Sequence, residues 1–160
     1  MSIEIVRKYF SSFGMEERIQ EFDVSSATVE LAAQAVGCIP ARIAKTLSFK
    51  VGEEPILIVA AGDAKIDNRK YKDQFGKKAV MLSSEEVSEK IGHAVGGVCP
   101  FGIPKTVHVY LDESLRRFET VFPAAGSSNS AIELSMKELE RYSNAEEWID
   151  VCKGWQEQEV

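Results

Sequence analysis

A glycine-rich segment and one lysine are the residues of this sequence best suited to do chemistry. The segment reads Gly96-Gly97-Val98-Cys99-Pro100-Phe101-Gly102, and the lysine is Lys45 in the apolar stretch Ala44-Lys45-Thr46-Leu47. Glycines let a ligand come close to bare backbone N–H groups, which bind oxygen atoms. Lysine supplies a compact positive charge on a flexible stem. Together these residues indicate a pocket for a carbonyl or a phosphate group.

Cys99 allows a different chemistry, nucleophilic attack by a thiolate. It lies in the glycine segment, shortly after His93. A thiol becomes a good nucleophile only where its surroundings lower its pKa, and nothing near Cys99 in the sequence does so. We therefore expect Cys99 to line a pocket rather than to attack. Cys38 and Cys152 are expected to be reduced apolar fillers, and the cysteine spacing predicts no metal site.

Interspersed helices and strands must position these residues. Hydrophobic spacing and capping residues predict helices over residues 3–13, 28–36, 68–75, 84–91 and 136–142, with a short one at Pro40. Strands are expected at residues 18–22, 45–51, 56–61, 79–82, 106–111, 120–122 and 132–134. Ser25 or Ser26 is expected to cap the second helix. Strands 45–51 and 56–61 form a hairpin. This order favours an α+β fold with a mixed, curved sheet.

Composition limits the classes of protein and partner. A chain of 160 residues with 44% hydrophobic and 28% charged residues is typical of one globular domain, here residues 1–160 with a frayed end. No apolar run approaches the ~20 residues of a membrane span, and the start lacks the order of a signal peptide. A cytoplasmic location without a membrane partner is therefore expected.

The net charge of −6 argues against a general DNA or RNA binder. One local basic run remains, made of Lys65, Arg69, Lys70, Lys72, Lys77 and Lys78. It is interpreted either as a solvated helix face or as a patch that faces RNA phosphates.

Four segments, in this order, resemble the YbaK/ProX-type aminoacyl-tRNA editing family, which includes the editing insertion of bacterial prolyl-tRNA synthetases. They are Ala44–Leu47, Ile56–Ala61, Gly96–Gly102 and Gly126–Leu134. The resemblance implies a distorted mixed β-sheet or barrel surrounded by helices. It also implies hydrolysis of the ester that joins a wrong amino acid to the terminal adenosine of a tRNA, usually tRNA for proline, with no metal or organic cofactor.

The same resemblance assigns roles to residues. Lys45 stands at the family's required lysine and is expected to hold the terminal phosphate or the carbonyl. Backbone N–H groups near Gly96 and Gly97 are expected to stabilise the charge that develops on the carbonyl oxygen. The resemblance also implies that the neighbouring ribose hydroxyl, or a water that it holds, takes part in the attack. The substrate-binding residues expected around them are Phe22, Thr28, Thr46, Val98, Cys99, Pro100, Gly126, Ser127, Ser128 and Ala131.

The family's cysteinyl-tRNA deacylases commonly carry two aromatic residues and an aspartate at the positions of Phe22, Thr28 and Ala131. Here Phe22 keeps a ring without a hydroxyl, Thr28 replaces a large flat side chain with a small polar one, and Ala131 removes a charge. Thr28, with Ser26 nearby, favours a small or hydroxylated amino acid such as alanine, serine or threonine. The predicted function is a trans-acting deacylase for tRNA for proline that carries Cys, Ala, Ser or Thr. Its expected partner is prolyl-tRNA synthetase or an elongation factor. The alternatives are a Cys99-dependent hydrolase and a non-catalytic module that binds tRNA or a synthetase.

Overall fold

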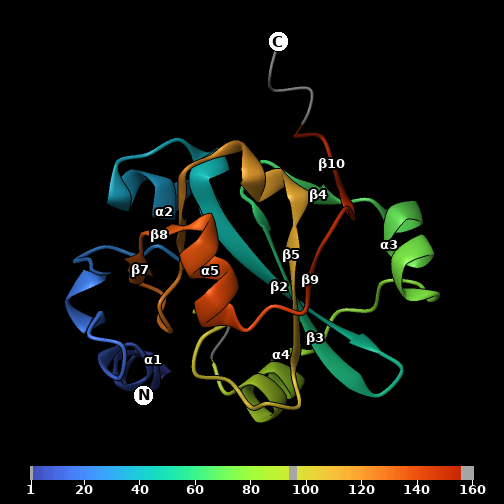
Figure 1. The fold of residues 1–160 in the computed structure, drawn as a ribbon, viewed down its shortest axis with the longest axis horizontal. Coiled ribbons are helices and arrows are strands. Elements are labelled where there is room, and N and C mark those ends of the chain that lie inside the picture. Colours follow the sequence, from blue (N-terminus) through green and yellow to red (C-terminus); the bar gives the residue numbers. More distant parts are fainter. Residues whose placement is uncertain (1, 94–96, 156–160) are drawn as a thin grey trace.

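A curled six-stranded mixed sheet forms the centre of the fold (Figure 1). The computed structural model describes residues 2–93 and 97–155. The order of the strands is β8-β6-β2-β3-β5-β9. Their bounds are β2 Ile43–Val51, β3 Glu54–Ala61, β5 His108–Asp112, β6 Thr120–Pro123, β8 Leu134–Ser135 and β9 Glu147–Ile149. β2 and β3 form the predicted antiparallel hairpin, while β2–β6, β3–β5 and β5–β9 pair in parallel. The α+β class with a distorted mixed sheet is confirmed.

Two short antiparallel pairs tie distant parts of the chain together. β1 (Ile19–Glu21) pairs with β7 (Ser130–Ile132), and β4 (Lys65–Ile66) pairs with β10 (Cys152–Lys153). The first pair brings the segment before α2 beside the glycine loop at residues 126–130. As a result, residues far apart in the sequence share one wall of the molecule.

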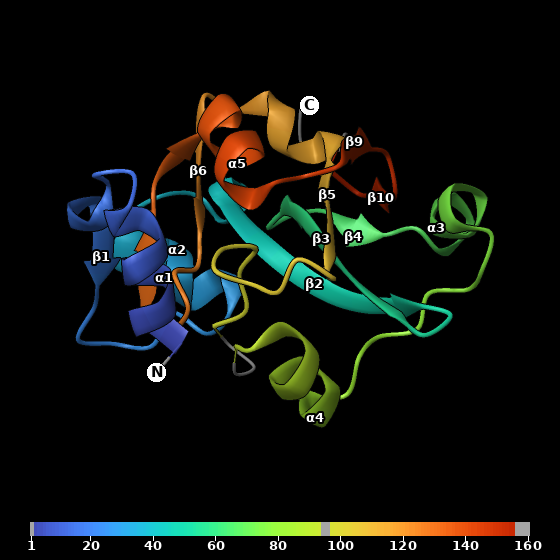
Figure 2. The ribbon, with the colours of Figure 1, turned by 60° about the horizontal axis from the view of Figure 1, so that its bottom comes forward.

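Within the described residues, five α-helices pack around this sheet. They are α1 Ser2–Ser11, α2 Val29–Val36, α3 Asn68–Phe75, α4 Ser84–Glu86 and α5 Met136–Ser143, and α4 continues as a π-helical turn over Val87–Ile91. Short 3₁₀ turns occupy Glu16–Arg18, Pro40–Arg42 and Glu113–Arg117. Figures 1 and 2 both place α3 at the opposite end of the molecule from α1 and α2.

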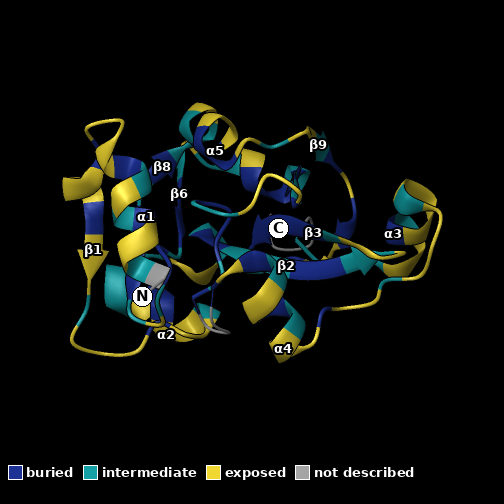
Figure 3. Ribbon diagram, turned by 90° about the horizontal axis from the view of Figure 1, so that it is seen from below, coloured by how far each residue is buried: buried dark blue, intermediate teal, exposed yellow. Residues whose placement is uncertain are grey.

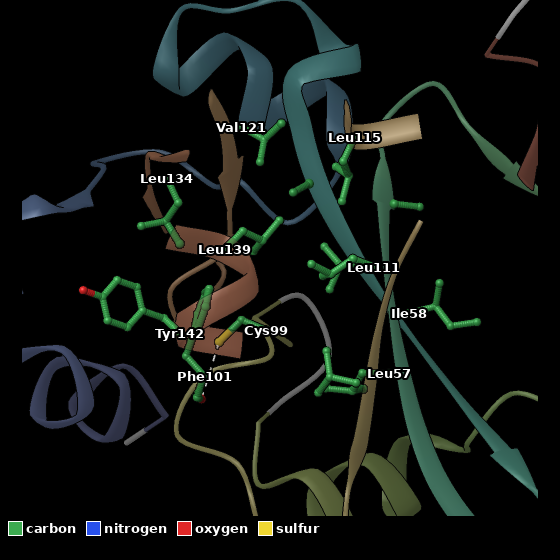
Figure 4. Close-up of a cluster of buried hydrophobic side chains, with 14 of the residues drawn as sticks. Leu57, Ile58, Cys99, Phe101, Leu111, Leu115, Val121, Leu134, Leu139 and Tyr142 are labelled. Carbon is green, nitrogen blue, oxygen red and sulfur yellow. Dashed lines mark hydrogen bonds between the residues drawn. The ribbon is translucent and has the colours of Figure 1, made fainter. Parts of the chain in front are cut away.

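The hydrophobic core lies where the middle strands meet α5 and the segment after the glycine loop. Leu57, Ile58, Leu111 and Leu139 are fully buried, and Figure 4 shows them in one cluster. Each buried leucine or isoleucine side chain contributes roughly 1.5–3 kcal/mol relative to an exposed one. In Figure 3 the central strands are buried, whereas α1 and α4 turn exposed residues outward. The continuous apolar run of β3 is therefore explained by its central position.

Several local expectations are corrected. Thr28, and not Ser25 or Ser26, caps α2, since its Oγ1 accepts a hydrogen bond from the N–H of Leu31 at 3.1 Å. Residues 79–82 form no strand beyond a single bridge between Met81 and Phe49. Strands β4, β9 and β10 were not expected, because short edge pairs depend on distant partners more than on local pattern. The final residues, 156–160, lie outside the described residues.

The basic run surrounds α3, far from α2. The side chain of Asp67 caps α3 by accepting hydrogen bonds from the N–H groups of Arg69 and Lys70. The ammonium of Lys70 donates to Asp150 and to the carbonyl of Cys152, each at 3.0 Å. One member of the run thus already has protein partners.

Candidate active site

A cavity of about 420 Å³ lies against β2, between the start of α2 and the region of α4. Small-molecule sites commonly have volumes of roughly 300–1,000 Å³. The residues that line it are Ser26, Ala27, Thr28, Val29, Ala32, Ile43, Ala44, Lys45, Thr46, Leu47, Ser48, Met81, Leu82, Ser84, Val87, Val98, Phe122, Ala124, Ser130 and Ala131. Lys45 is the one charged residue among these described lining residues. The wall is otherwise apolar, with a few hydroxyl groups.

Lys45 occupies the middle of the β2 side of this wall. It pairs with Ala60 across the hairpin and is half-buried. Its ammonium donates to the carbonyls of Ala64 and Gly62, the latter at 3.4 Å. Burial lowers the pKa of Lys45, since removal from water disfavours the charged form. An ammonium has three N–H bonds, so one donor remains for a ligand after these two contacts.

The loop of residues 62–64, whose carbonyls accept hydrogen bonds from Lys45, is held in place by close packing and by an ion pair. A Cβ atom on Gly62 would lie 2.1 Å from the carbonyl oxygen of Pro40 and 2.7 Å from Cγ1 of Val29. Asp63, the next residue, is held by two hydrogen bonds from the Arg117 guanidinium, at 2.5 and 3.0 Å. Sequence reasoning missed these residues. The Gly-Asp pair directly after a buried strand was the available signal.

The two glycine loops of the sequence meet in the structure. A Cβ atom on Gly97 would lie 2.7 Å from the backbone N and Cα of Ser127 and 2.9 Å from the carbonyl carbon of Gly126. Only glycine can take this position without moving the backbone opposite. Val98, the next residue, lines the cavity. Gly96, the other expected source of N–H groups, lies outside the described residues.

Cys99 points away from the cavity, which corrects the expectation that it lines a pocket. It is fully buried beside Phe101 in the core (Figure 4). Its Sγ lies 3.6 Å from Nε2 of His93, and that nitrogen is 3.0 Å from the carbonyl oxygen of Phe101. A carbonyl can only accept, so Nε2 carries the proton and cannot deprotonate the thiol. Burial raises the pKa of Cys99 to about 12. This environment argues against the Cys99-dependent hydrolase.

The remaining expected residues divide into two groups. Thr28, Thr46, Val98 and Ala131 line the cavity with Lys45, whereas Phe22, Pro100, Gly126, Ser127 and Ser128 are not among the lining residues. Several residues of the second group form backbone hydrogen bonds with segments that carry lining residues. The carbonyl of Ser128 accepts from the N–H of Ser26 at 2.6 Å, and the N–H of Phe22 donates to the carbonyl of Asn129 at 2.8 Å. They therefore shape the cavity through their backbone.

The family model for the aminoacyl-tRNA editing domain matches residues 23–142, a range that contains every lining residue named above. This chain belongs to the aminoacyl-tRNA editing domain family. A crystal structure described as that of a candidate trans-editing enzyme for prolyl tRNA synthetase is 30% identical to this editing domain, with a TM-score of 0.86 over 96% of this chain and 98% of that one. The predicted family and fold are therefore confirmed.

Sequence relatives of this editing domain include a short protein and a long synthetase. The uncharacterized protein YwhH of Bacillus subtilis strain 168 is 57% identical over 157 residues, which cover 98% of this chain and 100% of YwhH. The proline–tRNA ligase of Lysinibacillus sphaericus strain C3-41 is 26% identical over 92% of this chain. That match spans only 26% of the ligase.

Two features are absent from residues 2–93 and 97–155. No helix there has the length and apolar character to cross a membrane. No three His, Cys, Asp or Glu side chains in the same part of the chain gather in a way that could hold a metal ion.

Proposed function

We propose that this chain is a trans-acting aminoacyl-tRNA deacylase. Its substrate is tRNA for proline that carries a wrong amino acid, drawn from Cys, Ala, Ser and Thr. One observation carries the proposal: the cavity within the editing-domain match has Lys45 as the one charged group among its described lining residues. The match to proline–tRNA ligases supports the choice of tRNA.

The reaction needs little from the protein beyond positioning, because an aminoacyl ester is already activated. Water, or water held by the neighbouring ribose hydroxyl, adds to the ester carbonyl, and negative charge develops on the carbonyl oxygen. The bond between the carbonyl carbon and the ribose oxygen then breaks, and the ribose oxygen takes up the proton that the attacking water gives up. The free N–H of the Lys45 ammonium and the backbone N–H groups near Gly97 stabilise the charged oxygen or the terminal phosphate. Free amino acid and tRNA are released.

The test is hydrolysis of tRNA for proline charged with cysteine, alanine, serine or threonine. Wild type is compared with Lys45→Ala and with Lys137→Ala, a matched control that removes an exposed lysine of α5 outside both the cavity lining and the basic run. We expect turnover of at least one substrate by wild type and by Lys137→Ala. Loss of one well-placed charge donor costs roughly 10²–10³ in rate, so Lys45→Ala should be nearly inactive. Full activity of Lys45→Ala, or no turnover by wild type, would contradict the proposal, and the second result would favour a non-catalytic binding module.

The proposal extends to setting and partners. We propose that residues 1–160 act as one editing domain in the cytoplasm and work beside prolyl-tRNA synthetase. The net charge of −6 favours weak binding of free tRNA, so a partner that presents the acceptor end would help. The expected elongation-factor partner has no support among the relatives.

A further inference from the structure

Arg117 is not among the residues that line the cavity, yet it holds the loop that binds the Lys45 ammonium. The ammonium donates to the carbonyls of Gly62 and Ala64, and Asp63 lies between these two residues in the chain. The Asp63 carboxylate accepts two hydrogen bonds from the Arg117 guanidinium, at 2.5 and 3.0 Å. Both side chains are mostly buried, with 14% of Arg117 and 16% of Asp63 exposed. A bidentate pair of this kind fixes the orientation of the carboxylate as well as its distance.

The guanidinium of Arg117 is itself held on several sides. Its Nε donates to the carbonyl of Ser114 at 2.9 Å, and its Nη1 also lies 3.4 Å from the carbonyl oxygen of Trp155. The Trp155 ring lies against the guanidinium, with its centroid 5.1 Å from Cζ, a distance at which a cation is attracted to the ring. Each nitrogen of the guanidinium therefore has a protein partner. Arg117 can act as a rigid anchor for the loop of residues 62–64.

A fixed loop determines where the remaining N–H of Lys45 points. The three N–H bonds of an ammonium are arranged tetrahedrally, so two bonds to fixed carbonyls set the direction of the third. Gly62 is held independently of Arg117 by its close approach to Pro40 and Val29. The carbonyl of Ala64, on the other side of Asp63, depends more directly on the ion pair. A shift of ~1 Å in a group that positions a substrate can lower a rate about 10²-fold.

The Asp63 carboxylate is also a possible partner for the Lys45 ammonium. Burial lowers the pKa of Lys45, and the negative charge of Asp63 acts in the opposite direction. The other titratable groups that act on this ammonium are Cys152, Lys65 and Glu30. A buried carboxylate that loses its partner is strongly destabilising, and pairing with the ammonium would relieve that cost. The bond to Arg117 therefore keeps Asp63 from competing with a substrate for Lys45.

We propose that Arg117 is a positioning residue for Lys45. It holds the loop carbonyls on the ammonium and binds the Asp63 carboxylate, and it thereby leaves one ammonium N–H free for the substrate. The inference rests on the proposed deacylase function and adds two residues to its machinery. Neither residue lines the cavity, so both act through Lys45 and not on the substrate.

Hydrolysis of mischarged tRNA for proline gives the first test. Arg117→Met should lower kcat about 10²-fold, and Arg117→Lys, which cannot form the bidentate contact, should recover only part of that loss. Adding Asp63→Asn to Arg117→Met removes the carboxylate that would capture the ammonium, so the double variant should be faster than Arg117→Met. Arg116→Met is the matched control, since Arg116 is the exposed neighbour and pairs with Glu113 at 3.2 Å. It should behave as wild type. In an active enzyme, wild-type kcat in Arg117→Met, or a double variant slower than Arg117→Met, would overturn the inference.

Competitive acetylation with acetic anhydride tests the ammonium without any tRNA. Mass spectrometry compares the acetylation rate of Lys45 with that of the exposed Lys137 in the same folded molecule, as pH is raised. The midpoint for Lys45 should move to higher pH in Arg117→Met, because the freed carboxylate favours the ammonium, and to lower pH in Asp63→Asn, because that attraction is lost. If Arg117→Met does not fold, Arg117→Lys takes its place, with the same direction of shift.

The direction of the two shifts separates positioning from a general loosening of the fold. Opposite shifts in the Arg117 and Asp63 variants support the inference even if wild type hydrolyses no tRNA, in which case only the catalytic proposal fails. Loosening would expose Lys45 in both variants and move both midpoints up, toward that of an exposed lysine. Shifts in the same direction, or no shift in either variant, would therefore overturn the inference.

Discussion

Gly97→Ala tests the contact between the two glycine loops. The new Cβ would stand 2.7 Å from backbone atoms of Ser127 and 2.9 Å from the carbonyl carbon of Gly126. Ordinary Cβ contacts need at least 3.4 Å, so the loops must separate by more than half an ångström. Overpacking of this kind costs about 1–3 kcal/mol, which lowers Tm by roughly 2–12 °C for a chain of this length.

Gly97→Ala should slow hydrolysis by more than its loss of folding stability alone would explain. Displacing the backbone at Gly97 moves the N–H groups expected to face the carbonyl oxygen, and loss of such a donor costs roughly 10²–10³ in rate. The assay is single-turnover hydrolysis of mischarged tRNA for proline, with Tm measured on the same preparations.

Gly76→Ala is the control. Gly76 has a φ of +74° with nothing within 4 Å of a new Cβ, and it ends α3 at the far end of the molecule. Alanine there costs about 1 kcal/mol of backbone strain, or roughly 2–4 °C, and should leave hydrolysis unchanged. A Gly97→Ala protein with both the Tm and the hydrolysis rate of wild type would refute the reasoning about the loops.

Three further predictions concern single side chains. Burial lowers the pKa of Lys45, so on raising the pH the folded protein loses this proton before the unfolded chain does. The free energy of unfolding of wild type, relative to that of Lys45→Met, should therefore rise as pH increases toward 10.5. Urea titrations at pH 7, 9 and 10 measure this difference. Cys99→Ala removes a buried sulfur and should cost about 1–2 kcal/mol while hydrolysis stays at the wild-type level, and an inactive but folded variant would restore the thiol mechanism. Hydrogen bonds from Arg18 and from the N–H of Ser135 lower the pKa of Glu138 to about 2, so its contribution to stability is present above pH 4.5 and is lost as pH falls through about 2. Glu138→Gln should accordingly destabilise the protein by about 1 kcal/mol at pH 7 after allowance for solvent screening, and by much less at pH 2.5, as read from thermal unfolding.

Local sequence patterns were enough to predict the strands and helices that surround the candidate site. Apolar runs predicted the β2–β3 hairpin, and hydroxyl or carboxylate caps predicted the starts of α3, α4 and α5. Each of these features depends on residues close together in the chain. Lys45 could therefore be placed on a central strand before the structure was known.

The side chains that close the cavity could not be placed in the same way. Ser25, Ser26 and Thr28 are all suitable helix caps by residue type. Which of them caps α2 depends on how the preceding segment packs, and that segment is held by the hydrogen bond from the N–H of Ser26 to the carbonyl of Ser128. Whether Cys99 faced the cavity or the core depended on the rotation of one loop. The Arg117–Asp63 pair joins residues that no local pattern connects.

The pairing of Ser26 with Ser128 also sets when during synthesis the wall of the cavity can form. The β1–β7 pair and this hydrogen bond join parts of the chain about a hundred residues apart. At a ribosomal rate of roughly 5–20 residues per second, some 5–20 s pass between the emergence of one wall and of the other. A nascent chain that ends before β7 lacks that wall, although it already carries Lys45. We therefore expect ribosome-bound fragments to leave charged tRNA intact, and the proposed hydrolysis to begin only when nearly the whole chain is available to fold.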